Sequence, residues 1–207
     1  MLQDSLEKHS LPIDPVQTGV LNEYCRLLWE WNTRLNLTRH TDYDSFVGRD
    51  LLDTWHLAQQ IDSGTEVMDI GSGGGVPGIP LGILRPDLRI SMVESVKKKA
   101  AALEDIVRQL GLETPVYAER AEVVIAANPC STVTARAVAP LPRLLTWFEP
   151  LRSHFDQLLL IKGPRWKDEY KTASEDGLTK TVSCSEICSW RTAGRDGDSV
   201  LLRVTFD

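Results

Sequence analysis

The chain has 207 residues, and its 23 lysine and arginine side chains against 29 aspartate and glutamate side chains give a formal net charge of −6. Apolar residues make up 42% and charged residues 25%, which is typical of a globular protein with a full hydrophobic core. This composition excludes a disordered or fibrous protein, and the acidic balance argues against a surface that grips nucleic acid on every side.

The sequence contains neither an apolar stretch of about 18 residues nor a secretory signal, because residues 1–7 lack both basic and apolar regions. We therefore expect a cytoplasmic protein. Of the four cysteines, only Cys184 and Cys188 lie close together, with no histidine nearby. A zinc site usually needs four clustered ligands, so we expect free thiols and no metal.

Residues 1–62 are expected to be helical. Apolar side chains from Val20 to Leu35 recur at spacings of three and four, which places them on one stripe of a helix. Asp14 and Pro15 are typical of the cap and the first position of that helix. A second amphipathic segment spans residues 47–58. We interpret residues 1–62 as an N-terminal helical extension.

Residues 63–207 alternate strand-like and helix-like segments, which predicts a mostly parallel α/β sheet. The last two strand-like segments flank a turn-like sequence at residues 194–198, so we expect the sheet to end in an antiparallel hairpin. Helices are expected over residues 97–110, before Gly111, and over residues 141–148. The expected strands are 65–70, 88–93, 116–118, 132–138, 157–161, 181–190 and 199–206.

A glycine-rich segment directly follows the first expected strand and precedes a helix. Its residues are Asp69, Ile70, Gly71, Ser72, Gly73, Gly74, Gly75, Val76, Pro77 and Gly78. Glycines in this place let the backbone approach a ligand closely. The last three glycines of the D-x-G-x-G-x-G-x-x-G pattern also satisfy G-x-G-x-x-G, so a dinucleotide such as NAD has to be considered.

Two features of the loop favour S-adenosylmethionine over NAD. The glycines begin at Gly71, and Val76 takes the third glycine position counted from there. Asp69 ends the first strand, where its carboxylate suits a ligand that carries an ammonium and a sulfonium better than a pyrophosphate. The D-x-G-x-G-x-G pattern resembles the first motif of class I methyltransferases. The candidate cofactor-binding residues of the loop are Asp69, Gly71, Ser72, Gly73, Gly75 and Val76.

Glu94 ends the second expected strand, 23 residues after Gly71. An acidic residue about 20 residues beyond the first glycine accepts hydrogen bonds from ribose hydroxyls in dinucleotide-binding folds. Glu94 is therefore a further candidate cofactor-binding residue, although a solvated carboxylate at a strand end would show the same pattern.

The fourth expected strand carries no motif that holds an amino group for methylation. Asn128-Pro129-Cys130 lies before this strand, at the wrong edge of the sheet. The acceptor is therefore expected to be a good nucleophile already, as guanine N7 is, because its lone pair bears no proton. Arg136, at the carboxyl end of the strand, is the candidate catalytic residue through a contact to guanine O6 or a phosphate; a structural ion pair is the alternative.

The chain resembles the small-subunit ribosomal RNA methyltransferase G family, also called glucose-inhibited division protein B. The resemblance is carried by Trp31-Asn32, Asn36-Leu37-Thr38, residues 51–53, residues 69–80, Glu94-Ser95, Lys97-Lys98, residues 120–122, Arg136-Ala137 and Lys162-Gly163. It implies a Rossmann-like class I S-adenosylmethionine-dependent methyltransferase fold of seven strands over residues 63–207, with the helical extension in front. It also implies N7 methylation of one guanosine in bacterial small-subunit (16S) ribosomal RNA.

Carried over by position, the resemblance implies that Gly71 and Val76 line the methionine and ribose part of the cofactor site. Ala121 and Glu122 would lie at the adenine end, and Arg136 would face the cofactor and the incoming base. The partner would be small-subunit ribosomal RNA, either free or within a 30S subunit or assembly intermediate, and the enzyme is expected to be a monomer.

The sequence departs from the family pattern at Asp50, where the family commonly has histidine, and at Glu94, where aspartate is more usual. Candidate RNA-binding residues are Arg39, Lys162, Arg165 and Lys167, with a solvated charged surface as the alternative. Two other functions stay open from the residues: a methyltransferase acting on a small molecule or a protein, and a non-catalytic nucleotide-binding module.

Overall fold

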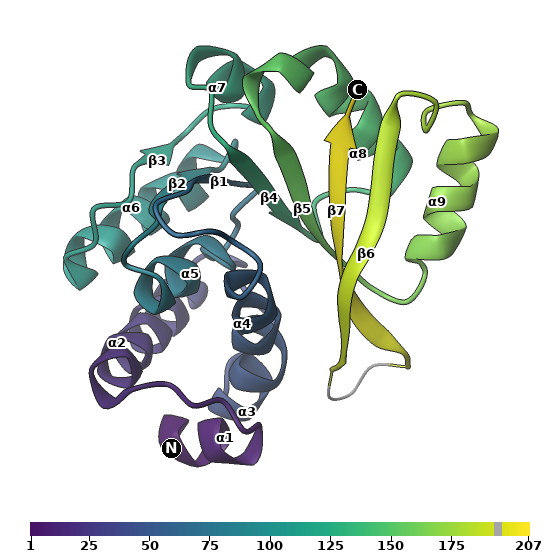
Figure 1. Ribbon diagram of the computed structural model, residues 1–207. Coiled ribbons are helices and arrows are strands. Elements are labelled where there is room, and N and C mark those ends of the chain that lie inside the picture. The colour runs from purple at the N-terminus through teal and green to yellow at the C-terminus, as the bar shows by residue number, and fades with distance from the viewer. Residues whose placement is uncertain (193–195) are drawn as a thin grey trace.

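The computed structural model describes residues 1–192 and 196–207. The N-terminal part folds into short helices that pack together at one end of the molecule (Figure 1). The carboxylate of Asp14 accepts hydrogen bonds from the backbone N–H groups of Val16 and Gln17, so it caps the long helix as its sequence predicts. The elements are α1 (Leu2–Lys8), α2 (Pro15–Asn32), α3 (Tyr43–Ser45), the π-helix η1 (Phe46–Leu51) and α4 (Leu52–Ala58).

Within the described residues, the central sheet has seven strands in the order β3-β2-β1-β4-β5-β7-β6. The first five strands pair in parallel, and β7 joins β5 and β6 in antiparallel fashion. The expected sheet with its C-terminal hairpin is confirmed, while part of the predicted turn at 194–198 lies outside the described residues. The strands are β1 (Glu66–Ile70), β2 (Arg89–Val93), β3 (Val116–Tyr117), β4 (Thr132–Arg136), β5 (Gln157–Lys162), β6 (Val182–Arg191) and β7 (Asp198–Phe206).

Helices cover both faces of this sheet and give a three-layered molecule. Alternating side chains set the layers: Met68 and Ile70 of β1 join the core beneath α7, α8 and α9, whereas Val67 points to the opposite face. The connecting helices are α5 (Gly78–Leu84), α6 (Lys97–Leu110), α7 (Ala121–Ala127), α8 (Leu141–Phe148), the 3-10 helix η2 (Glu149–His154) and α9 (Trp166–Glu175).

The N-terminal helices share a hydrophobic core with the methyltransferase-like part. Leu21 and Leu28 of α2 pack in one cluster with Ile79 of α5, Met92 of β2 and Leu103 of α6. Figure 1 shows α2 and α4 beside α5, with α1 and α3 farther from the sheet. The boundary between residues 1–62 and 63–207 stays a prediction about domains, and the common core makes the two parts one packing unit.

No helix among the described residues is long and apolar enough to cross a membrane. The four cysteines are free: Cys25 is buried, and the other three are partly buried. Described residues with His, Cys, Asp or Glu side chains form no group of three that could hold a metal ion.

Candidate active site

Three hollows open along the carboxyl ends of the parallel strands. The Trp147 hollow, of about 190 Å³, is lined by Gly71, Ser95, Glu119, Arg120, Ala121, Glu122, Val138 and Trp147, among others. The Arg49 hollow, of about 610 Å³, is lined by Leu37, Thr38, Arg39, His40, Arg49, Asp50, the loop residues 71–74, Val76 and Arg136, among others. The Lys162 hollow, of about 480 Å³, is lined by Asp53, Arg136, Val138, Lys162, Arg165 and Glu169, among others.

Shared residues join the three hollows into one crevice. Gly71 lines both the Trp147 hollow and the Arg49 hollow. Arg136 and Ala137 line both the Arg49 hollow and the Lys162 hollow, and Val138 joins the Lys162 hollow to the Trp147 hollow. The crevice therefore passes the glycine loop and Arg136, in the place where open α/β sheets bind their ligands.

The glycine loop has a backbone that only glycine adopts readily. Gly71, Gly73 and Gly75 have φ angles of +64°, +58° and +94°. A Cβ on Gly71 would come within 2.8 Å of Val138 Cγ2, whereas a Cβ on Gly73 would meet nothing closer than 3.8 Å. The loop therefore packs tightly against Val138 at Gly71 and leaves open space at Gly73. This is the cradle that an elongated cofactor needs.

Asp69 supports this loop from inside the protein. Its side chain is fully buried, and Oδ2 accepts a hydrogen bond of 3.1 Å from the N–H of Gly78. Burial raises the pKa of Asp69 to about 7. Ser72 is buried as well and donates its hydroxyl to the Asp69 carbonyl at 2.9 Å. The direct ligand contact expected of Asp69 thus stays a prediction, and the structure gives the carboxylate a role in shaping the loop.

Glu94 links the loop to the next strand. Its Oε2 accepts from the N–H of Gly73 at 3.0 Å, and Oε1 accepts from the N–H of Val96 at 2.8 Å. The carboxylate is therefore fixed beside the loop, where each oxygen keeps a lone pair for a second donor. This position agrees with the ribose contact expected of Glu94.

Ala121 and Glu122 begin α7 and line the Trp147 hollow, and their contact with the adenine stays a prediction. Trp147, from α8, forms the opposite wall of this hollow together with Val138. Arg143 lies over the Trp147 ring at 4.5 Å from its centroid. An indole that lines such a narrow apolar slot provides a surface against which a planar base can stack.

Arg136 lies between two buried carboxylates. Its Nε donates to Asp53 Oδ2 at 2.9 Å and its Nη2 to Asp50 Oδ1 at 2.6 Å, and the arginine side chain is 15% exposed. The ion pair that was the structural alternative for Arg136 is therefore present. It does not remove the residue from the crevice, because Arg136 lines two of the three hollows. A contact to the acceptor stays a prediction.

The four candidate RNA-binding residues differ in their surroundings. The ammonium of Lys162, 10% exposed, pairs with Glu169 at 2.6 Å and donates to the Ala139 carbonyl at 3.0 Å. These contacts fix the connection after β4 and differ from the phosphate contact we expected. Arg39, Arg165 and Lys167 are exposed.

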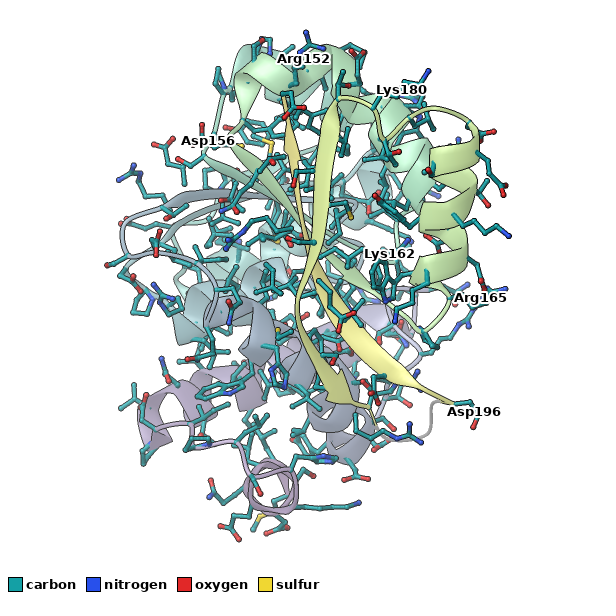
Figure 2. The ribbon with its side chains drawn as sticks, turned by 45° about the vertical axis from the view of Figure 1, so that its right-hand side comes forward. Arg152, Asp156, Lys162, Arg165, Lys180 and Asp196 are labelled. Atoms are coloured by element: carbon teal, nitrogen blue, oxygen red, sulfur yellow. The ribbon has the colours of Figure 1, made fainter. Side chains whose placement is uncertain are left out.

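Figure 2 shows Lys162 and Arg165 at one end of the sheet and Arg152, Asp156 and Lys180 toward the other end. Arg39 and Arg165 line the Arg49 hollow and the Lys162 hollow respectively. Arg39 and Arg165 therefore border the crevice, and Lys167 is exposed two residues beyond Arg165.

Several residues of the site could not be identified from the pattern of the sequence. Tyr24 of α2 is fully buried and donates its hydroxyl to the Gly74 carbonyl at 2.8 Å. Asp50 and Asp53 contact Arg136 from η1 and α4, and His40, in the connection between α2 and α3, contacts Asp50. The resemblance pointed to Asp53 through residues 51–53 and to Asp50 as a departure from the family pattern.

A fourth hollow, of about 690 Å³, opens at the amino ends of the strands and includes Asn128, Pro129 and Cys130. This placement agrees with the prediction that these residues lie before the fourth strand, on the side of the sheet opposite to the crevice. Burial also raises the pKa of the Cys130 thiol to about 11, which argues against a nucleophilic role.

Comparison with known proteins identifies one family. Residues 17–195 match the family model described as rRNA small subunit methyltransferase G. A protein of Rhodopirellula baltica named ribosomal RNA small subunit methyltransferase G is 45% identical over 186 residues, covering 90% of this chain and 80% of that protein. A protein of the same name from Chromobacterium violaceum is 31% identical over 206 residues, covering 99% and 96%.

Solved structures agree with this identification at the level of the fold. A ribosomal protein L11 methylase from Lactobacillus delbrueckii superposes with a TM-score of 0.56 at 14% identity, covering 80% of each chain. The family model spans most of the chain, and close relatives align almost from end to end. The chain therefore belongs to the rRNA small subunit methyltransferase G family.

Proposed function

We propose that this chain transfers the methyl group of S-adenosylmethionine to N7 of a guanosine in bacterial small-subunit (16S) ribosomal RNA. Family membership supplies the reaction class, the cofactor and the RNA acceptor. The structural observation that carries the proposal is the continuous crevice, in which Gly71 and Arg136 connect neighbouring hollows. The cofactor and the base can therefore lie end to end along the carboxyl ends of the parallel strands.

The cofactor supplies an electrophilic methyl group on a sulfonium, and the protein's task is to align it with the acceptor. In our proposal the adenine lies in the Trp147 hollow, Glu94 accepts from the ribose hydroxyls, and the amino-acid part lies against the glycine loop in the Arg49 hollow. The cradle fits, because Gly73 leaves open space where the loop lines the Arg49 hollow.

Guanine N7 needs no general base, because its lone pair lies in the ring plane and carries no proton. Catalysis then rests on alignment and on electrostatic stabilisation within the crevice. In the proposal, Arg136 approaches guanine O6 or the adjoining phosphate, since a contact to N7 would block the lone pair that attacks. The new bond joins N7 to the methyl carbon as the bond from that carbon to sulfur breaks.

The RNA face in this proposal consists of Arg39, Arg165 and Lys167. All three are exposed, and Lys162 is left out because Glu169 already neutralises its charge. A local rim of cations is compatible with a net charge of −6, because binding to RNA phosphates needs only the surface around the crevice to be positive. We further propose that the enzyme acts as a monomer in the cytoplasm, where ribosomal subunits are assembled.

The first test incubates the protein with labelled S-adenosylmethionine and small ribosomal subunits that lack this modification. Separation of the digested nucleosides should give a single labelled peak at 7-methylguanosine, and Arg136→Ala should abolish it. Labelling at another position, or no label in RNA despite measurable binding of the cofactor, would overturn the assignment of the acceptor. Activity retained after nuclease treatment would indicate a small molecule or a protein.

The RNA face is tested separately by charge reversal. Arg165→Glu and Lys167→Glu should each weaken RNA binding and lower the slope of log affinity against log salt by about 1 per lost phosphate contact. Lys180→Glu makes the same charge change at an exposed position near the other end of the sheet (Figure 2) and should leave the slope unaltered. An unchanged slope in both Arg165→Glu and Lys167→Glu would contradict the proposed face.

A further inference from the structure

Arg136 is held by a clamp of two aspartates from the N-terminal helices. Asp50, in the π-helix η1, and Asp53, in α4, both point at the guanidinium and contact it at 2.6 Å and 2.9 Å. Both carboxylates are buried, and each binds a different nitrogen of the same fork. Two contacts on separate nitrogens fix the plane and the direction of a guanidinium, which one contact cannot do.

The second oxygen of each aspartate contacts a nitrogen of an aromatic ring. His40 Nδ1 lies 2.9 Å from Asp50 Oδ2, and Trp190 Nε1 donates to Asp53 Oδ1 at 3.0 Å. Every carboxylate oxygen in the clamp thus has at least one partner. The clamp consists of His40, Asp50, Arg136, Asp53 and Trp190, and it joins the N-terminal helices to β4 and β6.

His40 is placed firmly for this contact. Its carbonyl accepts from Trp29 Nε1 at 2.9 Å, and its backbone N–H donates to Thr38 Oγ1 at 3.0 Å. The side chain is 21% exposed and lines the Arg49 hollow beside the glycine loop. Asp50 is therefore in contact with Arg136 through one oxygen and with a crevice residue through the other.

The charges of the clamp make His40 an important partner. Burial by itself would raise the pKa of Asp50, but His40 and Arg136 outweigh burial and lower it below its ordinary value. Arg39 and Arg49 line the same hollow as His40.

We propose that His40 and Asp50 act as a positioning pair that fixes the guanidinium of Arg136 toward the acceptor end of the crevice. The inference rests on the proposed function, in which Arg136 meets the target nucleotide. It gives a role to Asp50, because the imidazole of His40 is linked to Arg136 through this carboxylate.

A positioning pair has a specific kinetic signature. Asp50→Asn keeps the shape of the side chain and removes its charge, so the guanidinium loses the ion pair with residue 50 and keeps the one with Asp53. We expect kcat to fall about 10- to 100-fold, as for a misplacement of about 1 Å, with the dissociation constant of S-adenosylmethionine within about twofold of wild type. His40→Gln should lower kcat less, and it should have no further effect in the Asp50→Asn background, because His40 acts through Asp50.

The chain provides a matched control in a second aspartate–histidine pair. His9 Nε2 lies 3.1 Å from Asp44 Oδ1, within the N-terminal helices, and neither residue lines the crevice. Asp44→Asn removes a contact of the same kind and should leave kcat unchanged. A parallel fall of kcat, cofactor affinity and melting temperature in Asp50→Asn would instead indicate a purely structural role and overturn the inference.

A second readout does not depend on the acceptor. The Nε–H resonance of Arg136 in the ¹⁵N-labelled enzyme can be assigned by its loss in Arg136→Lys. It should shift or broaden in Asp50→Asn and His40→Gln, and it should stay in place in Asp44→Asn. An unmoved resonance in Asp50→Asn overturns the positioning pair whatever the enzyme methylates, whereas a wild-type enzyme that forms no 7-methylguanosine overturns only the proposed function.

Discussion

The buried carboxyl of Asp69 predicts a stability that depends on pH in an unusual direction. Burial raises its pKa from the ordinary 3.8 to about 7, and each pKa unit corresponds to about 1.4 kcal/mol. A carboxyl whose pKa is raised by folding is favoured in its neutral form. Its contribution to stability is therefore fully present below pH 3.8 and is lost as the pH rises through about 7.

Asp69→Asn replaces the carboxyl by a neutral group of the same shape, which does not titrate. The free energy of unfolding of the wild type should fall relative to that of the variant by about 4 kcal/mol over the whole titration. About 2.5 kcal/mol of this change falls between pH 5 and pH 8. Urea denaturation at intervals across this range measures both free energies of unfolding. The wild type should lose stability relative to the variant as the pH rises.

The same substitution at Asp156, which is exposed near the opposite end of the sheet (Figure 2), corrects for the general effect of changing one charge. If the difference between wild type and Asp69→Asn stays constant from pH 5 to pH 8, burial does not govern this carboxyl. The loop would then supply a partner for the charged form beyond the N–H of Gly78.

Three further changes test the contacts around the crevice. Gly71→Ala adds a Cβ 2.8 Å from Val138 at a φ of +64°. The backbone strain should lower the free energy of unfolding by about 1–2 kcal/mol, and the affinity for the cofactor, measured by calorimetry, should fall at least tenfold. A second substitution, Val138→Ala, should relieve the clash but not the backbone strain. Tyr24→Phe leaves a buried loop carbonyl without its donor and should lower the free energy of urea unfolding by about 1–2 kcal/mol. Glu169→Gln leaves the mostly buried charge of Lys162 without its carboxylate and should cost about 1.5–3 kcal/mol in the same assay; no change would show that the ion pair is dispensable.

Local patterns predicted those parts of the fold that local physics decides. Apolar spacing and a following glycine predicted the helix α6 over Lys97–Leu110, and Gly111 indeed adopts a φ of +65° as its C-cap. The glycine loop was identified correctly because its backbone requires glycine at particular positions. The helices α7 and α9 were not predicted as separate elements, since α7 is only Ala121–Ala127 and α9 buries little apolar surface.

Contacts between distant residues could not be predicted in the same way. Arg136 and its two aspartates are 83 and 86 residues apart in the chain, and no periodicity connects them. Lys162 resembles any other cation after a strand until Glu169 is seen beside it. The sequence therefore predicts that the candidate site residues follow the carboxyl ends of the strands, and the structure alone shows which of their charges are already paired.

The arrangement around Arg136 bears on how the helical N-terminal part should be understood. Tyr24 holds the glycine loop from α2, and Asp50 and Asp53 hold the guanidinium from η1 and α4. The methyltransferase-like sheet provides the arginine, but its orientation depends on carboxylates that lie outside the sheet. A fold that is shared by methyltransferases of many acceptors can acquire its own acceptor geometry in this way, because the added helices contact the loop and the arginine at once. We therefore regard residues 1–62 as one wall of the active site.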